Sequence, residues 1–447
     1  AVSSTLGASG KCVILEDGGG NPQITKDGVT VADSVILLDP VENMGAKLLK
    51  EAARKTVKEA GDGTTTATVL AHSILSEAYK VVETQSTRDI KEGINLAVNK
   101  VVQYLEKNSS IVKGDKIKQV ATISANNDKH LGEVISEAFE AVDETGVVMM
   151  ETHEHPETIV ERVEGVQYEK GIVSGHFKNN KPLLIIADVD TQVMTALAMN
   201  KIKGNIKVNI IDAPTYGINK RDTLDDLAAL TGATLINEDL GDDMDLIQPE
   251  HLGSCLKSIT SPGETIIQLE EIPEQVEDII KSIKNKIKET TNPNLVTRLE
   301  KRLGRLLAKV AIVKVGANSE IELKEKRDRV EDAICATKAA IKEGIVPGGG
   351  IALLNASVNT KANSEGEKVL LEAIKAPYKT ILTNAGLEIV YPQTKNRGLN
   401  VVTGKEVNMV KAGIIDPLLV TKSALINAAS VATTILSTDC VINNLRA

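Results

Sequence analysis

Aromatic residues are scarce in this chain of 447 residues. Phe, Trp and Tyr together make up 2% of it, Trp is absent, and Phe139 and Phe177 are the only phenylalanines. The hydrophobic core must therefore be built mainly from Ala, Val, Ile and Leu, of which Ala and Leu favour helices. This composition argues against an aromatic-rich β-sandwich and favours packed helices.

Three further absences argue against other classes of protein. The four cysteines form no Cys-x-x-Cys pair, so neither a disulfide framework nor a zinc ribbon is expected, and a reducing compartment fits better. The net charge of −9 argues against a nucleic-acid binder, which needs a basic surface. No run of about 18 apolar residues occurs, so no membrane span is expected, and the first residues show no secretory signal pattern.

The order of the predicted elements indicates an α/β segment between two helical ones. At about 150 residues per domain, the length corresponds to roughly three domains. Apolar residues recur at helical spacing towards both ends, whereas the middle alternates short apolar runs with helices. The simplest architecture is an α/β domain inserted into a helical domain. Helices are expected at 43–60, directly after 61–63, and at 89–107, 129–142, 191–203, 220–231, 273–309 with a break at 292–293, 326–343, 365–386 and 417–437, and strands at 147–150, 158–160, 183–186, 208–211 and 234–236.

The strongest local signal is the sequence GDGTTT at 61–66, between two predicted helices. Its glycines let the backbone approach a ligand, and the next helix offers unpaired N–H groups at its positive dipole end. Three hydroxyl groups add donors for phosphate oxygens, and the carboxylate of Asp62 suits Mg²⁺. A purely structural explanation also stands: one helix stops here, and an Asp or Thr caps the next.

Other loops carry weaker signals. Residues 5–11 (TLGASGK) form no Walker A loop, because two residues separate the glycines where that motif has four. The glycines at 348–350 form a third such loop, and residues 24–28 indicate a turn with Asp-Gly at its tip. His153 and His155 share one face of a strand, but no third metal ligand is evident.

Two aspartates also have structural explanations of their own. Asp332 lies about 200° around its predicted helix from Val330, so by itself it is expected to be a solvated surface carboxylate. Asp416 precedes Pro417 at the start of the last predicted helix, where an Asp cap followed by Pro is a sufficient explanation.

Together these motifs resemble those of the group I chaperonins, the GroEL type. Their order and spacing agree over nearly the whole chain, and the ten-residue sequence at 61–70 is highly specific. The resemblance is carried by TLG (5–7), ITKDGV (24–29), ENMGA (42–46), GDGTTTATVL (61–70), TISAN (122–126), KPLLIIA (181–187), VKVGA (313–317), RVEDA (329–333), GGGIAL (348–353) and GIIDP (413–417).

The resemblance implies a multidomain α and α/β fold with three domains. A mainly helical equatorial domain, which binds ATP, would comprise residues 1–107 and 343–447. A small intermediate hinge domain would comprise 108–163 and 311–342. The inserted α/β apical domain, which binds client proteins, would comprise 164–310.

The resemblance further implies ATP as the ligand, with Mg²⁺ at Asp62 and K⁺ beside Thr5 and Lys26. The residues implied to contact the nucleotide are Thr5, Leu6, Gly7 and Lys26 along the phosphates, Asp62, Gly63, Thr64, Thr65 and Thr66 at Mg²⁺ and the phosphate oxygens, Gly349 against the ribose or base, Asp416 at the ribose, and Asn400 and Ile414 near the adenine.

For catalysis, the resemblance implies that Asp332 and Asp27 activate the water that attacks the γ-phosphate. Asp332 would lie across a hinge from the nucleotide, so that hydrolysis is coupled to apical movement. The implied client-binding positions are apolar: Ile172, Val173, Phe177, Met194, Leu197, Ala198 and Met199. Exposed Met side chains suit promiscuous binding, although part of this stripe is equally explained as apical core.

The implied partners are further copies of the chain in a ring, with seven subunits expected, unfolded client proteins and a lid co-chaperonin. Neither nucleic acid nor membrane is an expected partner. The expected location is cytoplasmic, an organellar matrix or an infected host cytoplasm. The alternative to a folding chaperone is a small-molecule ATPase or kinase whose α/β domain binds the substrate.

The chain departs from the family pattern at several places. Ala8 stands where the family has Pro, Val401 and Val402 where it has Ala-Ala, and residues 308–309 where it has Gly-Gly. Between Phe177 and residue 181 the family carries a further segment that includes a client-binding helix.

Overall fold

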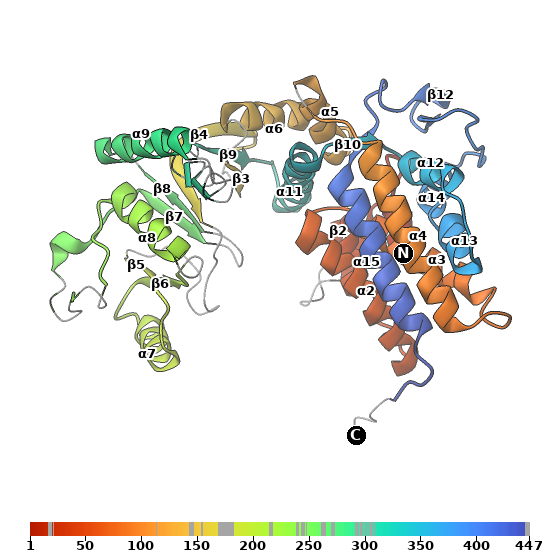
Figure 1. Cartoon of the computed structure of the whole chain (residues 1–447), viewed down its shortest axis with the longest axis horizontal. Helices are drawn as coiled ribbons and strands as arrows, with labels where there is room; N and C mark the ends of the chain where they lie inside the picture. Colours follow the sequence, from red (N-terminus) through yellow and green to blue (C-terminus); the bar gives the residue numbers. More distant parts are fainter. Residues whose placement is uncertain are drawn as a thin grey trace. The chain divides into compact units, whose positions relative to one another are not determined.

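The computed structural model describes residues 1–16, 20, 22–112, 114–142, 147–152, 155–168, 183–213, 218–237, 241–242, 246, 248–260, 265–269, 273–290, 295, 298–299, 302–303, 306 and 309–442 (Figure 1). The chain forms two compact units. Unit 1 comprises Ala1–Ser136, Met150–Ile159 and Lys314–Ala447, and unit 2 comprises Glu137–Met149 and Val160–Val313. The helical, α/β, helical order is confirmed, whereas the three finer domain boundaries stay a prediction.

Unit 1 is built around long helices whose ends follow local sequence signals. α2 (Pro40–Ala60) begins at Asp39, whose carboxylate accepts hydrogen bonds from two backbone N–H groups of the first turn. Gly61 ends the helix in the left-handed conformation, at a φ of 73°, which glycine adopts without strain. α2 packs against α3 (Thr64–Tyr79) and α15 (Leu418–Leu436), and α15 also packs against α4 (Thr87–Lys107) (Figure 1).

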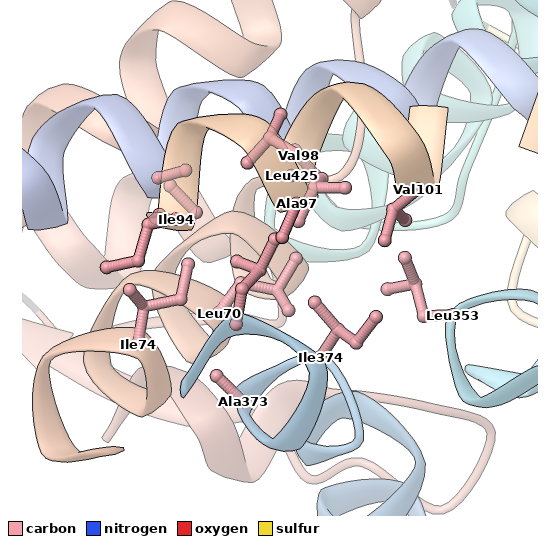
Figure 2. Close-up of a cluster of buried hydrophobic side chains, with 14 of the residues drawn as sticks. Leu70, Ile74, Ile94, Ala97, Val98, Val101, Leu353, Ala373, Ile374 and Leu425 are labelled. Carbon is pink, nitrogen blue, oxygen red and sulfur yellow. The ribbon is translucent and has the colours of Figure 1, made fainter. Parts of the chain in front are cut away.

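The core between these helices is aliphatic, as the composition requires. Leu70 and Ile74 from α3, Ile94 from α4 and Leu425 from α15 are almost completely buried. Figure 2 shows them interleaved with smaller Ala and Val side chains of the same cluster. Each buried Leu or Ile side chain contributes about 1.5–3 kcal/mol to folding.

The remaining helices of unit 1 follow the prediction only in part, since none was expected at 2–5, 28–34, 115–124 or 351–359. The single helix expected at 365–386 is wrong, because the chain forms α13 (Glu365–Ala373) and α14 (Ala376–Asn384). Pro377 lies in the first turn of α14, where its missing N–H favours a new start over a continuous helix. The others are η1 (Val2–Thr5), α1 (Gly28–Ser34), α5 (Asp115–Ser124), α11 (Glu320–Glu343) and α12 (Ile351–Asn359), while α6 (Lys129–Val142) crosses the boundary to unit 2.

The described part of unit 1 contains three small antiparallel sheets. They pair β1 (Val13–Glu16) with β2 (Pro22–Thr25), β10 (Ile345–Pro347) with β13 (Ile415–Pro417), and β11 (Arg397–Asn400) with β12 (Lys405–Asn408). Of these, only the pair β10–β13 joins segments that are distant in sequence. The second pair matters for the site, because Val346 lies opposite Asp416 and the glycine loop that follows β10 starts beside β13.

The α/β region contains a five-stranded sheet in the order β3 (Val147–Thr152), β9 (Lys309–Val315), β4 (Ile159–Tyr168), β8 (Thr265–Gln268), β7 (Lys257–Thr260). A parallel pair, β5 (Leu183–Ile186) and β6 (Val208–Ile211), is connected by α7 (Thr191–Ile202). The other described elements are α8 (Ile218–Thr231), η5 (Pro249–His251) and α9 (Glu274–Glu289).

The strand expected at 234–236 is wrong. These residues have no regular structure, and the Thr234 N–H donates to the carbonyl of His251, in a loop, instead of to a strand. The other expected strands are present. The expected break at 292–293 lies outside the described residues.

The structure bears on the expected lack of disulfide bonds, of a histidine metal site and of a membrane span. All four cysteines are free thiols, as expected. Among the described residues no His, Cys, Asp and Glu cluster could by itself hold a metal, and His153 lies outside them. In the described part of the chain, α15 has the length and hydropathy of a membrane span, contrary to the expected lack of such a segment, and 61% of its apolar window is buried inside the protein.

Candidate functional site

A cavity of about 930 Å³ lies within unit 1. It is lined by segments that are hundreds of residues apart in sequence, and its volume is typical of sites for ligands the size of a nucleotide. The cavity brings together all fifteen residues expected at the nucleotide or in catalysis: Thr5, Leu6, Gly7, Lys26, Asp27, Asp62, Gly63, Thr64, Thr65, Thr66, Asp332, Gly349, Asn400, Ile414 and Asp416.

The junction between α2 and α3 forms one wall. Gly63 is the N-cap of α3 at a φ of 90°, and no side chain caps this helix, so the alternative of an Asp or Thr cap is wrong. The first turn at 64–66 therefore presents unpaired N–H groups and hydroxyls to the cavity. An added Cβ at Gly63 would lie 2.7 Å from Val420 Cγ1. Both this close contact and the positive φ therefore require glycine here.

The N-terminal loop packs against this junction. Thr5 is buried, and its Oγ1 lies 3.1 Å from Oγ1 of Thr65. Lys26 donates from Nζ to the carbonyl of Gly7 at 3.3 Å and to Oδ1 of Asn126 at 2.8 Å. Burial lowers the pKa of this ammonium. The arrangement places one positive charge beside the turn of α3.

Asp27 is the N-cap of α1. Its Oδ1 accepts from the N–H of Val29 at 3.2 Å, and its Oδ2 accepts from the N–H and the hydroxyl of Thr30 at 2.8 and 2.7 Å. The interpretation of residues 24–28 as a simple turn is therefore incomplete, because a helix starts there. Three hydrogen bonds fix this carboxylate at the edge of the cavity.

Asp332 lines the cavity from α11, so its interpretation as a solvated surface carboxylate is wrong. Val330 is fully buried on the other side of the helix, as its position around the helix predicts. Burial raises the pKa of Asp332 well above its usual range, and the charges of Asp62 and Asp27 raise it further. A carboxylate with a raised pKa is a stronger base.

Asp62 and Asp416 complete the acidic side of the cavity. Burial raises the pKa of Asp62, the N–H of Gly63 lowers it, and the charge of Asp27 raises it. Asp416 belongs to β13, and Pro417 is the N-cap of α15, so the expected capping role of Asp416 is wrong. Burial and the charge of Asp62 raise the pKa of Asp416 to about 7, although a hydrogen bond from the N–H of Gly349 lowers it.

The opposite end of the cavity is apolar. Leu399, Val401, Met409 and Ile414 line it and belong to one hydrophobic cluster. Gly349 keeps this end open, because an added Cβ would lie 2.9 Å from the Met409 terminal methyl. The cavity thus joins a polar end with N–H donors to an apolar end, the pattern that a nucleotide requires.

The residues present fit a divalent cation only together with phosphates. No three acidic or imidazole groups in the described part of the chain converge on one point, but Mg²⁺ is commonly held by one or two carboxylates, phosphate oxygens and water. Asp62 fits that role. For K⁺, Thr5 offers a hydroxyl oxygen, whereas the side chain of Lys26 has no acceptor and only its carbonyl remains.

Three charged residues of α11 that line the cavity were missed by the sequence analysis, and Glu325 is one of them. Asp328 and Arg329 also line the cavity. Burial and then the charge of Asp27 raise the pKa of Asp328, while Arg329 is held by Glu325 at 2.8 Å and lies 3.6 Å from Asp128. The spacing of Asp328 and Arg329 from Asp332 by four and three residues, which places these three on one helix face, is the signal that identifies them.

The apolar positions expected to bind clients have different surroundings. Ile172, Val173 and Phe177 lie outside the described residues. On α7, Ala198 is buried against β6, and Met194 and Leu197 pack against the same cluster. Met199 is 49% exposed.

Comparison with known proteins identifies the class. The sequence matches the TCP-1/cpn60 chaperonin family over residues 1–181 and 177–446, and the chain belongs to this family. It is therefore a chaperonin. Among solved structures, it is similar to the chaperonin gp146 from the bacteriophage EL of Pseudomonas aeruginosa, crystallised in the presence of ATP-BeFx. The match has a TM-score of 0.79 at 20% identity and covers 100% of this chain and 96% of that one.

Proposed function

We propose that this chaperonin binds and hydrolyses ATP in the cavity of unit 1 and uses the reaction to promote the folding of non-native proteins. The observation that carries the proposal is the convergence of the loop at 5–7, the turn at 61–66, the loop at 348–350 and α11 on one cavity. The similar phage chaperonin was crystallised with ATP-BeFx, which supports a nucleotide as the ligand.

The two ends of the cavity suit the two ends of ATP. The triphosphate would meet the unpaired N–H groups and hydroxyls at 64–66 and the ammonium of Lys26. The base would lie against Val401, Met409 and Ile414. Asp416 would accept a hydrogen bond from a ribose hydroxyl.

Hydrolysis needs a water held in line with the γ-phosphate. Asp332, with its raised pKa, would accept a proton from that water as its oxygen bonds to the γ-phosphorus and the bond to the β–γ bridging oxygen breaks. Asp27, which is fixed by Val29 and Thr30, would orient the water. Asp62 would hold Mg²⁺ together with the phosphates, and that ion would supply neutralisation of the negative charge on the phosphate groups.

Client binding is proposed for the exposed part of α7. Met199 is half exposed, and Val193 and Ile202 add exposed fractions of 53% and 65%. Flexible and aliphatic side chains of this kind adapt to many partners. Met194, Leu197 and Ala198 would support this surface from below, because they pack on β6. Ring assembly with seven subunits and a lid co-chaperonin are proposed from the family resemblance.

The decisive experiment is nucleotide binding by the full chain with Asp62→Lys. Replacing the proposed Mg²⁺ ligand by a cation is expected to abolish MgATP binding in calorimetry, while Glu51→Lys, an exposed change on α2 outside the cavity, is expected to bind normally. Undiminished affinity in the Asp62 variant would overturn the site. Rings in negative-stain micrographs and ATP hydrolysis stimulated by unfolded protein would indicate a folding chaperone. A monomer whose hydrolysis depends on a small metabolite would indicate the alternative, a small-molecule ATPase or kinase.

A further inference from the structure

α11 meets the junction between α2 and α3 at Cys335. Gly61 ends α2 directly before Asp62, and a Cβ added to Gly61 would lie 2.4 Å from Cβ of Cys335 and 2.8 Å from its Sγ. Atoms that are not bonded do not approach so closely without one of them moving. The side chain of Cys335 therefore fills the space that any side chain at position 61 would need.

The contact lies in the middle of one continuous face of α11. Asp328, Asp332, Cys335 and Ala339 follow one another at spacings of four, three and four residues, which places them on one side of the helix. The two carboxyl groups line the cavity. Ala339 packs with Ala60 at the end of α2. A displacement of α11 at Cys335 would therefore be passed to Asp332, which lies one helical turn away.

The surroundings leave a larger side chain at position 335 little room. On another side of α11, Ala336 and Ala340 are fully buried in a cluster that includes Val120 of α5. In front of Cys335 stands the main chain of Gly61, whose N–H donates to the carbonyl of Val57 at 2.7 Å. Main chain held in this way cannot turn aside as a flexible side chain does, so a larger side chain would push α11 and the junction apart.

The thiol of Cys335 is suited to packing and not to reaction. Burial, followed by the charges of Glu331, Asp332 and Asp62, raises its pKa to about 12. The group therefore stays protonated at neutral pH, and a protonated thiol is a poor nucleophile. It also adds no further negative charge beside Asp62 and Asp332. A side chain at this position has to be both small and uncharged.

We propose that Cys335 is a positioning residue, which by packing against Gly61 sets the distance between Asp332 and the turn that faces the phosphates. The inference rests on the proposed function, because Cys335 acts through the base of that reaction. A misplacement of about 1 Å can cost a reaction about 10²-fold. The size of the side chain at position 335 is therefore expected to control kcat.

The first experiment is a series of side chains of different size in the full chain. Cys335→Ser keeps the size and is expected to keep kcat. Cys335→Leu is expected to lower kcat by about tenfold or more, with an affinity for ATP in calorimetry that stays within about threefold. Unchanged turnover, or an equal loss of affinity, would overturn the proposal. If Cys335→Leu does not fold, Cys335→Val decides in its place, with an expected fall of about threefold or more.

Lys338→Leu is the matched control. Lys338 lies on α11 three residues after Cys335, but it is exposed and does not line the cavity. The same enlargement here is expected to leave kcat unchanged. A fall equal to that of Cys335→Leu would assign the effect to the helix as a whole and would refute the role of the contact with Gly61.

A double-variant cycle tests whether Cys335 acts through Asp332. Asp332→Glu makes the base one methylene longer, which misplaces it in the unmodified chain but compensates for an α11 that stands further away. The loss of kcat caused by Asp332→Glu is therefore expected to be at least about threefold smaller in the Cys335→Leu or Cys335→Val chain. Independent losses would overturn the proposal. If the unmodified chain does not hydrolyse ATP, the proposed function fails instead, so the two failures are distinguishable.

Discussion

Replacing Asp332 by Asn separates binding of ATP from its hydrolysis. The side chain keeps its size, so the lining of the cavity is preserved, but the base is lost. A positioned general base contributes about 10²–10⁴-fold to a rate, which corresponds to about 3–5 kcal/mol of barrier. A loss of kcat in this range is therefore expected.

The same substitution is expected to leave the affinity for ATP equal or higher. The charge of Asp332 interacts unfavourably with Asp62 and Asp27, and it would also repel the γ-phosphate. Removing it lowers the cost of bringing further negative charge into the cavity. Thermal stability is expected not to fall, because a desolvated charge is removed.

Single-turnover hydrolysis and calorimetric binding of ATP, measured on the same preparation, test both expectations. Glu331→Gln is the control, since it removes an adjacent, exposed carboxylate of α11 that does not line the cavity, and its turnover is expected to be normal. Turnover of Asp332→Asn within about threefold of the unmodified chain would refute the reasoning, because loss of a general base costs at least about 10²-fold.

Three further predictions follow from the structure. The native state holds the proton of Asp416 up to about pH 7, whereas the unfolded chain releases it near pH 3.8, so the free energy of unfolding falls as pH rises between these values. In urea titrations, Asp416→Asn is expected to make this fall shallower by up to about 1.4 kcal/mol per pH unit. Equal slopes for the variant and the unmodified chain would contradict the prediction. Gly63→Ala is expected to cost at least about 1–2 kcal/mol of stability, because it combines a positive φ with a contact to Val420, and an unchanged denaturation midpoint would contradict this. Met199→Ser is expected to weaken capture of unfolded protein with ATP turnover unchanged, which light scattering of an aggregating client measures; full protection would remove Met199 from the client surface.

Much of the fold was predictable because periodicity and stop signals act locally. The starts of α3 and α15 follow from apolar spacing and from Gly63 and Pro417 beside them. The failures also have local causes. The expectation of one helix at 365–386 left out the effect of Pro377 on the preceding turn. At 234–236, the bond that the structure describes runs from the Thr234 N–H to the carbonyl of His251 in a loop and not to a strand.

The acidic residues of the site were a different case, because each had an adequate local explanation. When only the neighbouring helices are considered, Asp62 and Asp416 are explained as helix N-caps and Asp332 as a solvated surface carboxylate. The structure removes two of these explanations by making Gly63 and Pro417 the caps. Only the family resemblance pointed from the sequence to their convergence.

The sequence by itself determined the aliphatic helical core, the inserted α/β region and the family, since composition, spacing and motifs are properties of the chain. Tertiary structure alone decided that the carboxyl of Asp332 lies within the electrostatic influence of Asp62 and Asp27. The physical reason is that burial and the charge of neighbours distant in sequence set the pKa of a carboxyl group, and neither is encoded in the spacing of residues along one helix.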